Sequence, residues 1–271
     1  MIGAVVLADH PDEAFGARQR AAAEREQSLE RPGRRSHSPG ISGVWHEQGY
    51  DLTKTLYRYF QWNTFTLDMF ESGKLFFCSP AKWKDPYEAW WCRHLFRNES
   101  KLASVKAYGM CFTRAYADEP YWRLYDNSNT VPVIRVAIEP GDLLDVLDRY
   151  AQEKECKVYL GRVQYHSREE LNEELERLKG EGEAGEVARL AAHALMLKRD
   201  AFEMEDEHRV VIIERGAKSD FLQLPFDPAE LFFGIRLSPA TSQVDEGILR
   251  RYLRRHRFAA KTSKSQASTS Q

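Results

Sequence analysis

The sequence of 271 residues contains no long apolar run. None approaches the roughly 20 consecutive apolar residues that a helix needs to span a bilayer. The apolar opening, residues 1–8, is short, has no basic start and is followed at once by Asp9 and His10, which is a poor match to a signal peptide. A formal net charge of −2 gives no global attraction to nucleic acid or to anionic lipid. We therefore expect a cytoplasmic protein that makes no membrane contact.

The sequence is also poor in patterns that bind metals or form disulfides. Its four cysteines form no CxxC pair and no metal-ligand spacing, and its eight histidines are scattered; the cysteines are Cys78, Cys92, Cys111 and Cys156. There is no Walker loop, no GxGxxG, HExxH or GxSxG motif and no kinase signature. We expect reduced cysteines and no metal cofactor, and the common nucleotide-binding and hydrolase motifs are excluded.

What the sequence does contain is enough apolar material for one packed core. Hydrophobic residues make up 42% of the chain and aromatic residues 12%. Residues 1–43 are rich in Ala, Arg, Glu, Ser, Pro and Gly and predict a disordered N-terminal extension, and residues 258–271 predict a disordered polar tail. Residues 44–257 are then predicted to form a single domain.

The pattern within that domain predicts an α+β fold with a mixed, largely antiparallel sheet and flanking helices. Strands are predicted at 56–60, 74–78, 108–113, 131–138, 157–165, 205–214 and 231–236. Helices are predicted at 64–72, 142–154, from 167 onward, 184–198 and 242–256. Gly73 closes the first helix, and Ser167 with Glu170 forms a capping box. Because strands precede and follow the helical block, α+β is favoured over a doubly wound sheet.

The most distinctive segment is Leu75–Glu88, with the sequence LFFCSPAKWKDPYE. Its first three residues lack polar alternation, which predicts a strand covered on both faces. Pro80 cannot donate to a sheet ladder and restricts Ser79 to an extended conformation, so the strand ends there. The loop that follows places Asp85 and Glu88 beside aromatic rings. Loops held by a rigid strand often carry catalytic or binding residues. Ser79 is either a ligand-binding hydroxyl or an ordinary turn residue.

A second candidate site lies at Glu205–Arg209, which precedes a β-branched run. On a strand, Glu205, Glu207 and Arg209 would share one face, about 7 Å apart. Two carboxylates on one face can divide their roles, one stabilising a cation and the other accepting a proton. The alternative is a solvent-facing salt bridge in which Arg209 neutralises both acids. Lys198, seven residues before Glu205, is a candidate for a further charge in the same region.

Three other segments combine arginine with aromatic or basic neighbours. Arg58, in an aromatic strand, either binds an anion or lies at a solvent edge. Arg114 and the aromatic segment at 120–127 either stack a planar ring or fill the core. A basic segment near the C-terminus could contact the phosphates of nucleic acid, although cations are also favourable at the C-terminal end of a helix; it contains Arg250, Arg251, Arg254, Arg255 and Arg257.

Taken together, these motifs resemble the signature of DUF2971, a bacterial family of unknown function. The family has a tyrosine-basic-tyrosine strand followed by an SxPxxFNDPxE loop, which correspond here to residues 57–59 and 79–88. Its later motifs are a CFS strand, a WxHY segment, a VxY strand, a K…W…ExExR element and a closing strand. They correspond here to residues 111–113, 122–125, 163–165, 198–209 and 231–236. The resemblance covers residues 56 to about 255. The chain departs from it at Lys84, Leu124 and Phe202, where the family has Asn, His and Trp, so any role of that His falls here to another residue.

The order of these motifs also resembles that of ADP-ribosyltransferases of the Arg–Ser–Glu type. The resemblance implies NAD as substrate, with Arg58 on the pyrophosphate, Ser79 on the nicotinamide half and Glu207 as catalytic carboxylate. Glu205 would help activate the acceptor. Nicotinamide would stack on the aromatic rings around the loop, which also carries Asp85; the candidates are Tyr57, Trp83 and Tyr87. Cleaving the bond between nicotinamide and ribose develops a cation that a fixed carboxylate stabilises.

Two other classes of function fit the same residues. One is a non-catalytic module that binds a protein or a nucleic acid through the Asp85 loop and the basic C-terminal segment, as in bacterial defence or toxin–antitoxin systems. The other is a metal-independent nuclease that uses Arg58, Glu207 and Arg209. The acceptor of a transferase, whether a protein or a nucleic acid, does not follow from the sequence.

Overall fold

The computed structural model describes residues 44–83, 85, 87–88, 105–115, 119–125, 131–180, 187–258 and 262–264. The chain divides into two units, Met1–Pro39 and Gly40–Gln271, and the described residues all belong to the second. The expected N-terminal extension, residues 1–43, lies outside the described residues, as do Lys84 and Cys92. No helix in the described ranges combines the length and the apolarity that crossing a membrane requires.

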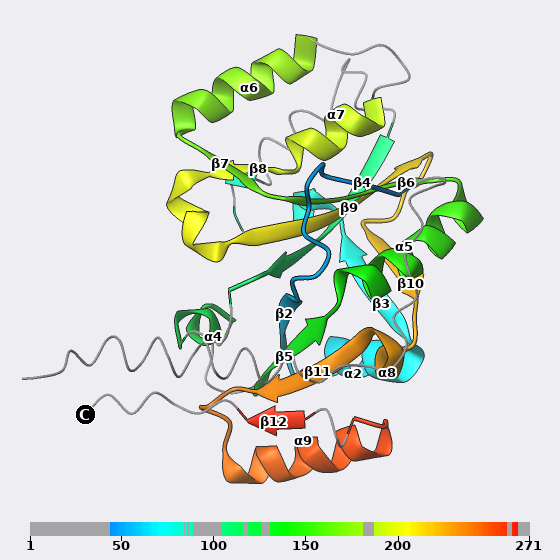
Figure 1. Cartoon of the computed structure of the whole chain (residues 1–271), viewed down its shortest axis with the longest axis vertical. Helices are drawn as coiled ribbons and strands as arrows, with labels where there is room; N and C mark the ends of the chain where they lie inside the picture. Colours follow the sequence, from blue (N-terminus) through cyan, green and yellow to red (C-terminus); the bar gives the residue numbers. More distant parts are fainter. Residues whose placement is uncertain are drawn as a thin grey trace, which may run out of the picture. The chain divides into compact units, whose positions relative to one another are not determined.

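A mixed, largely antiparallel sheet forms the centre of the second unit, as predicted (Figure 1). Its main path runs through β1 (Val44–His46), β6 (Lys157–Arg162), β9 (Glu207–Arg215), β4 (Val105–Thr113), β2 (Leu56–Gln61), β5 (Val133–Ile138), β11 (Phe232–Leu237) and β12 (Thr262–Lys264). The outermost pairs, β1–β6 and β11–β12, are parallel, and the pairs between them are antiparallel. Strands β3 (Lys74–Cys78) and β10 (Phe221–Pro225) extend the sheet from β4. The fold is α+β.

Strand β4 is where the sheet forks. It pairs with β2 at Thr113 and with β3 at Gly109. Between these two positions, the Nη1 atom of Arg58 donates a hydrogen bond to the backbone carbonyl of Cys111. A buried carbonyl needs a donor, and here a side chain supplies it. The fork therefore places a charged side chain inside the sheet, next to the central strands.

One face of the sheet carries the larger apolar core. Four helices pack there: α2 (Thr64–Ser72), α5 (Pro140–Lys154), α8 (Pro228–Leu231) and α9 (Gln243–Arg255). On the opposite face, α6 (Arg168–Gly180) and α7 (Val187–Ala194) cover the β9 residues Val211 and Ile213. Further along that face, α4 (Glu119–Tyr125) packs its aromatic rings on Tyr59. Glu207 and Arg209 lie on this second face, beyond the area covered by α6 and α7.

The structure confirms several local predictions made from capping and turn residues. Gly73 ends α2 with a φ of +61°, as predicted, and the side chain of Asn63, for which no prediction was made, caps the start of the helix. Strand β3 ends at Cys78, and a 3₁₀ turn, η1 (Pro80–Lys82), follows. Ser167 and Glu170 exchange the two hydrogen bonds of a capping box at the start of α6.

Three predicted boundaries are wrong. Glu205 ends the 3₁₀ turn η3 (Asp200–Glu205), and β9 starts only at Glu207, because Asp206 adopts a left-handed φ of +37°. Helix α7 ends at Ala194, and Leu197–Arg199 forms β8, which pairs with β7 (Gln164–His166) in a small parallel sheet. The domain also continues past residue 257, since Phe258 is buried in the main core and β12 pairs with β11.

Candidate functional site

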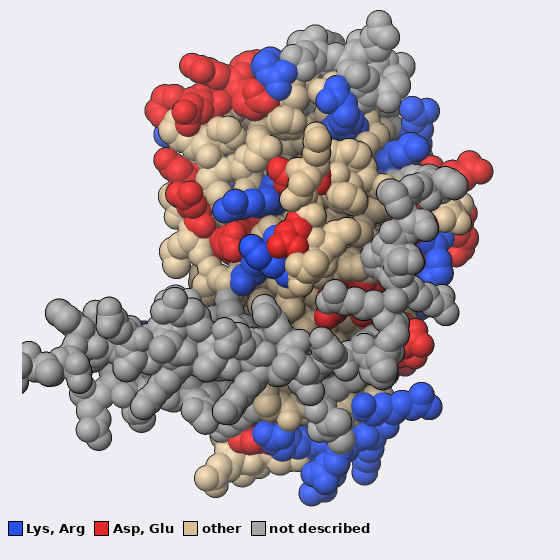
Figure 2. Space-filling view, viewed as in Figure 1, with Lys and Arg blue, Asp and Glu red and all other residues tan. Residues whose placement is uncertain are grey.

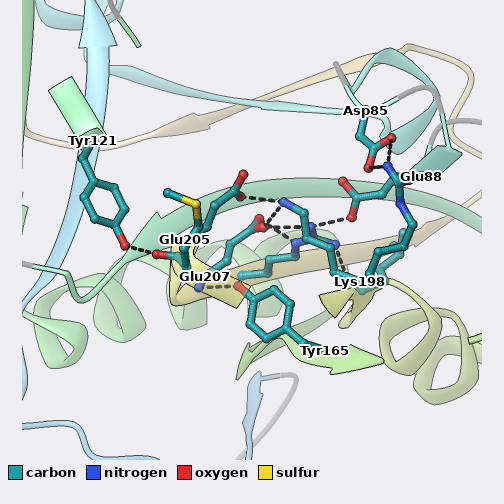
Figure 3. A network of polar contacts seen from close by, with 11 residues as sticks. Asp85, Glu88, Tyr121, Tyr165, Lys198, Glu205 and Glu207 are labelled. Atoms are coloured by element: carbon teal, nitrogen blue, oxygen red, sulfur yellow. Dashed lines mark hydrogen bonds and ion pairs between the residues drawn. The ribbon is translucent and has the colours of Figure 1, made fainter. Parts of the chain in front are cut away.

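Glu207 and Arg209 form the centre of a buried ion network (Figure 3). They are two residues apart on β9, so they share one face of the sheet. Arg209 donates from Nε to Oε1 of Glu207 at 2.7 Å and from Nη2 to Oε2 at 3.0 Å, a bidentate pair. Arg209 is 0% exposed and Glu207 4%. The predicted sharing of one strand face by Glu207 and Arg209 is confirmed. The salt bridge that the alternative predicted is also present, but it is buried and not on a solvent face.

Lys198 joins Glu205 to this pair. From β8, its Nζ atom donates to Oε2 of Glu205 at 2.6 Å and to Oε2 of Glu207 at 2.8 Å. The sequence predicted that Glu205 shares a strand face with Glu207. It does not, because the turn at Asp206 separates Glu205 from β9. The lysine bridge nevertheless brings the two carboxylates together. The Glu205 side chain is 25% exposed and the Glu207 side chain 5%, so Glu205 is the one that reaches solvent.

The loop after β3 closes the network from the other side. Glu88 accepts a hydrogen bond from Nη2 of Arg209 at 2.6 Å, and its side chain is buried. The Trp83 ring lies under the guanidinium of Arg209, 4.4 Å from Cζ to the ring centroid. A β-carbon at Gly109 of β4 would overlap this indole, so the ring position requires glycine there.

The charges of the network do not cancel when every group is ionised. The carboxylates of Glu88, Glu205 and Glu207 face two cations, Lys198 and Arg209, which leaves one negative charge in excess. Burial acts to raise the pKa of Glu207, but Arg209 and Lys198 outweigh it and lower that pKa to about 2. For Glu88, burial outweighs the same two cations and raises the pKa. Glu207 is therefore held ionised at all physiological pH values.

Arg58 and Glu207 meet at Cys111. Arg58 donates to the Cys111 carbonyl, and the Cys111 side chain lies close enough to the Glu207 carboxylate to help lower its pKa. The Nε atom of Arg58 is buried without a hydrogen bond, and the described residues offer this guanidinium no ion pair. Tyr125 of α4 lies near the same three groups. Within the described residues, an arginine without a counter-ion thus lies beside an acidic network.

Each of the rings predicted to stack on nicotinamide faces an arginine of the chain itself. Besides Trp83, the Tyr57 ring lies 4.3 Å from Cζ of Arg135, and the Tyr87 ring 5.0 Å from Cζ of Arg199. Asp85 accepts from Arg199 at 3.1 Å and from the backbone N–H of Tyr87 at 2.8 Å. The Asp85 loop is therefore tied to β8 next to Lys198, and these rings would have to share or exchange their arginines to bind a ligand.

Ser79 is not brought into the network. It is the N-cap residue of the turn η1, where its backbone carbonyl accepts from the N–H of Lys82. Its side chain is buried and makes no capping hydrogen bond, and the described residues give its hydroxyl no contact with Glu207 or Arg58. The turn interpretation of Ser79 accounts for its backbone contacts, and a ligand role stays a prediction.

The arginines of the basic segment lie on α9 and just after it. Four of them are exposed: Arg251, Arg254, Arg255 and Arg257. The described residues give these four no ion pair, whereas Arg250 pairs with Glu246 at 2.9 Å. Figure 2 shows Lys and Arg atoms gathered at the end of the molecule that α9 forms.

Sequence reasoning missed the residues that complete the network from distant elements. Glu88 was placed in a loop without a partner, and Tyr165, whose hydroxyl accepts from the Glu207 N–H at 2.9 Å, was treated only as part of a strand. In the sheet, Arg209 lies opposite Cys111 of β4 and Gly161 of β6. Which residues become neighbours in this way depends on the register between strands, and register is not visible in the chain order.

The network is rich in hydrogen-bonded carboxylates and cations rather than in soft or nitrogen ligands. No group of three or more His, Cys, Asp or Glu side chains in the described ranges is arranged to hold a metal ion. Its chemistry is that of fixed charges and of proton transfer by carboxylates. Comparison of the chain with protein-family models, with curated proteins and with solved structures finds no match.

Proposed function

We propose that the protein cleaves the N-glycosidic bond of NAD and transfers ADP-ribose to an acceptor. One observation carries this proposal: Arg58, without a described counter-ion, donates to the Cys111 carbonyl, and the ionised Glu207 lies beside the Cys111 side chain. An anionic pyrophosphate needs a cation of this kind, and a developing oxocarbenium ion needs a fixed negative charge. The motif order that resembles Arg–Ser–Glu ADP-ribosyltransferases suggests the same roles for Arg58 and Glu207.

In this reaction the bond between the nicotinamide nitrogen and ribose C1′ breaks, and its electron pair leaves with nicotinamide. A nucleophile of the acceptor forms the new bond to C1′, and its proton passes to a carboxylate. The excess negative charge of the network favours the cationic transition state. Arg209 and Lys198 together bind both carboxylate oxygens of Glu207, so it acts as a fixed charge. Glu205 reaches solvent and is the carboxylate that takes the proton.

The test is nicotinamide release from NAD by purified protein with protein, DNA and RNA acceptors. We expect Glu205→Gln to lower the rate at least about 100-fold, the usual contribution of a general base, with little change in KM for NAD. Glu203→Gln is the matched control, because Glu203 lies in the same 3₁₀ turn but is exposed. The absence of release by folded wild-type protein with all three acceptors would overturn the proposal.

The surface of α9 favours a nucleic acid as the bound macromolecule, either as acceptor or as the partner of a non-catalytic module. Four exposed arginines without described acidic partners match a phosphate backbone in charge. We expect Arg251→Gln with Arg255→Gln to reduce the salt dependence of single-stranded DNA binding by about 1.4 logarithmic units per logarithmic unit of salt. Arg168→Gln with Arg177→Gln on the acidic helix α6 is the control pair, measured by fluorescence anisotropy. Equal effects of the two pairs would contradict a specific role of α9.

A further inference from the structure

A small pocket lies at the edge of the sheet, between β1 and α7. Trp45, Tyr159 and Met196 supply its apolar walls, and Gly161, Glu47 and His193 also line it. None of the five residues of the ion network lines it. Its volume is about 130 Å³. A cavity of about 150 Å³ in another protein binds benzene, so this pocket has room for one six-membered ring.

The two aromatic walls of the pocket are arranged to hold a planar group. The rings of Trp45 and Tyr159 form a corner, with centroids 5.8 Å apart and planes at 53°. Trp45 is 53% exposed, so much of the indole surface lacks a protein neighbour. An aromatic ring with an open face stacks on planar ligands such as a nucleobase.

Gly161, the last residue but one of β6, leaves space that a side chain would fill. A β-carbon at this position would lie 3.5 Å from Cε of Met196 and 3.9 Å from Oε2 of Glu47, which are ordinary contact distances. No steric conflict therefore requires glycine here. Glycine inside a strand weakens it and marks positions where a ligand approaches the backbone closely.

Glu47 supplies one oriented acceptor beside this apolar space. Its Oε2 accepts from the backbone N–H of Arg162 at 3.1 Å, which fixes the carboxylate. The described residues give Oε1 no hydrogen bond, so it is available to a donor on a ligand. Carboxylates recognise the exocyclic amino group of cytosine in this way.

We propose that the pocket binds a six-membered nitrogen heteroaromatic ring whose exocyclic amino or amide group donates to Glu47. The ring stacks in the corner of Trp45 and Tyr159 over Gly161. A cytosine base and nicotinamide both have this chemistry. The proposal does not depend on NAD cleavage, because the ring is recognised by residues outside the ion network.

The test is calorimetric titration of the full-length protein with cytidine, nicotinamide and 3-acetylpyridine in the absence of NAD. We expect cytidine or nicotinamide to bind with a Kd at or below about 1 mM. We expect 3-acetylpyridine, which is neutral and has the ring of nicotinamide but no donor, to bind at least tenfold more weakly. The tighter of the first two identifies the source of the ring. No binding of either up to several millimolar, or equal binding of 3-acetylpyridine, would overturn the proposal.

Two variants test the position of the ring. Gly161→Val fills the space and should weaken ring binding at least tenfold while leaving Tm unchanged or raised. Glu47→Gln keeps the shape and should weaken cytidine or nicotinamide several-fold without affecting the neutral 3-acetylpyridine. Gly247→Ala is the control, since nothing lies within 4 Å of that glycine's missing β-carbon. Wild-type affinity in Gly161→Val would place the ring elsewhere. A failure of NAD cleavage would leave these titrations unaffected.

Discussion

Strand β9 shows two contrasting ways of filling a protein interior. On one face, Val210 and Ile212 enter the apolar core formed with α5 and the neighbouring strands. On the other face, Glu207 and Arg209 are equally buried but are ionised, hydrogen-bonded and surrounded by further charges. The two faces belong to one strand and alternate residue by residue. Apolar packing therefore changes along the second face, which is charged at Glu207 and Arg209 and becomes apolar at Val211 and Ile213, under α6 and α7.

The contrast indicates that the charged face is not there for stability alone. Removing charges from water costs several kcal/mol per ion, and well-packed apolar residues often stabilise as much or more. The apolar face demonstrates that this strand can be packed with Val and Ile at no such cost. A fold that keeps buried charges where apolar residues would serve is expected to use them, because departures from simple packing concentrate at functional sites.

The largest difference between the faces should come from removing one partner of the buried ion pair. Arg209→Met keeps most of the side-chain volume but leaves Glu88 buried without its cation and Glu207 with Lys198 alone. We expect a loss of about 3–5 kcal/mol in the free energy of unfolding, measured by urea denaturation. Arg215→Met, at the exposed end of the same strand, is the control and should cost little. A loss below 1 kcal/mol for Arg209→Met would mean that water or another cation replaces the arginine.

The apolar face should respond to loss of volume rather than of charge. Ile212→Ala should lower the free energy of unfolding by about 2–5 kcal/mol, through lost burial and the cavity left behind, and Ile212→Val by only about 0.5–1.5 kcal/mol. This graded response to size is the signature of packing. If the two substitutions cost the same, Ile212 is not packed as the structure places it.

As the pH falls, the two faces should lose their contributions to the free energy of unfolding in different pH ranges. His208, the first residue on the apolar side of β9, has its pKa lowered from 6.5 to about 3 by burial and by the charges of Arg114 and Arg162. The unfolded state binds this proton first, so the stability from neutral His208 is complete above pH 6.5 and is lost as pH falls toward 3. The Glu207 contribution is complete above pH 4.5 and is lost as pH falls toward 2.

Urea denaturation between pH 7 and 4 separates these contributions. His208→Gln should remove a slope of up to about 1.4 kcal/mol per pH unit, the value for one proton. Tyr50, whose hydroxyl lies 2.9 Å from Nδ1 of His208, can still pair with the glutamine. His46→Gln, at an exposed position on β1, is the control. An unchanged slope in His208→Gln would show that His208 is protonated in the folded protein.

The apolar face was largely predictable from the sequence, and the charged face only in part. The β-branched run after Arg209 indicates a buried strand whatever its neighbours are, because the pattern depends on local residues. The position of Glu207 and Arg209 on one face also followed from the two-residue period. Glu88 and Cys111 reach the network from the loop after β3 and from β4, and their positions depend on strand register and on the fork in the sheet. Asp206, with its positive φ, moved Glu205 off the strand, and no local pattern at that position predicts it.

The smallest expected effect on stability is that of Glu205→Gln, and it separates a structural role of Glu205 from a chemical one. Glu205 is bound by Lys198 at 2.6 Å but is partly exposed, so Glu205→Gln should change the free energy of unfolding by less than about 1 kcal/mol. Glu207→Gln changes the same chemical group two residues away, where Arg209 and Lys198 would be left with an uncharged partner, and should cost several times more. Urea denaturation of both variants, beside nicotinamide release, separates the two roles. If Glu205→Gln loses nicotinamide release at nearly full stability, the charged face has a chemical role. Equal destabilisation by both substitutions would mean that Glu205 belongs to the structural part of the network, and that its bridge to Lys198 holds the turn at Asp206 in place.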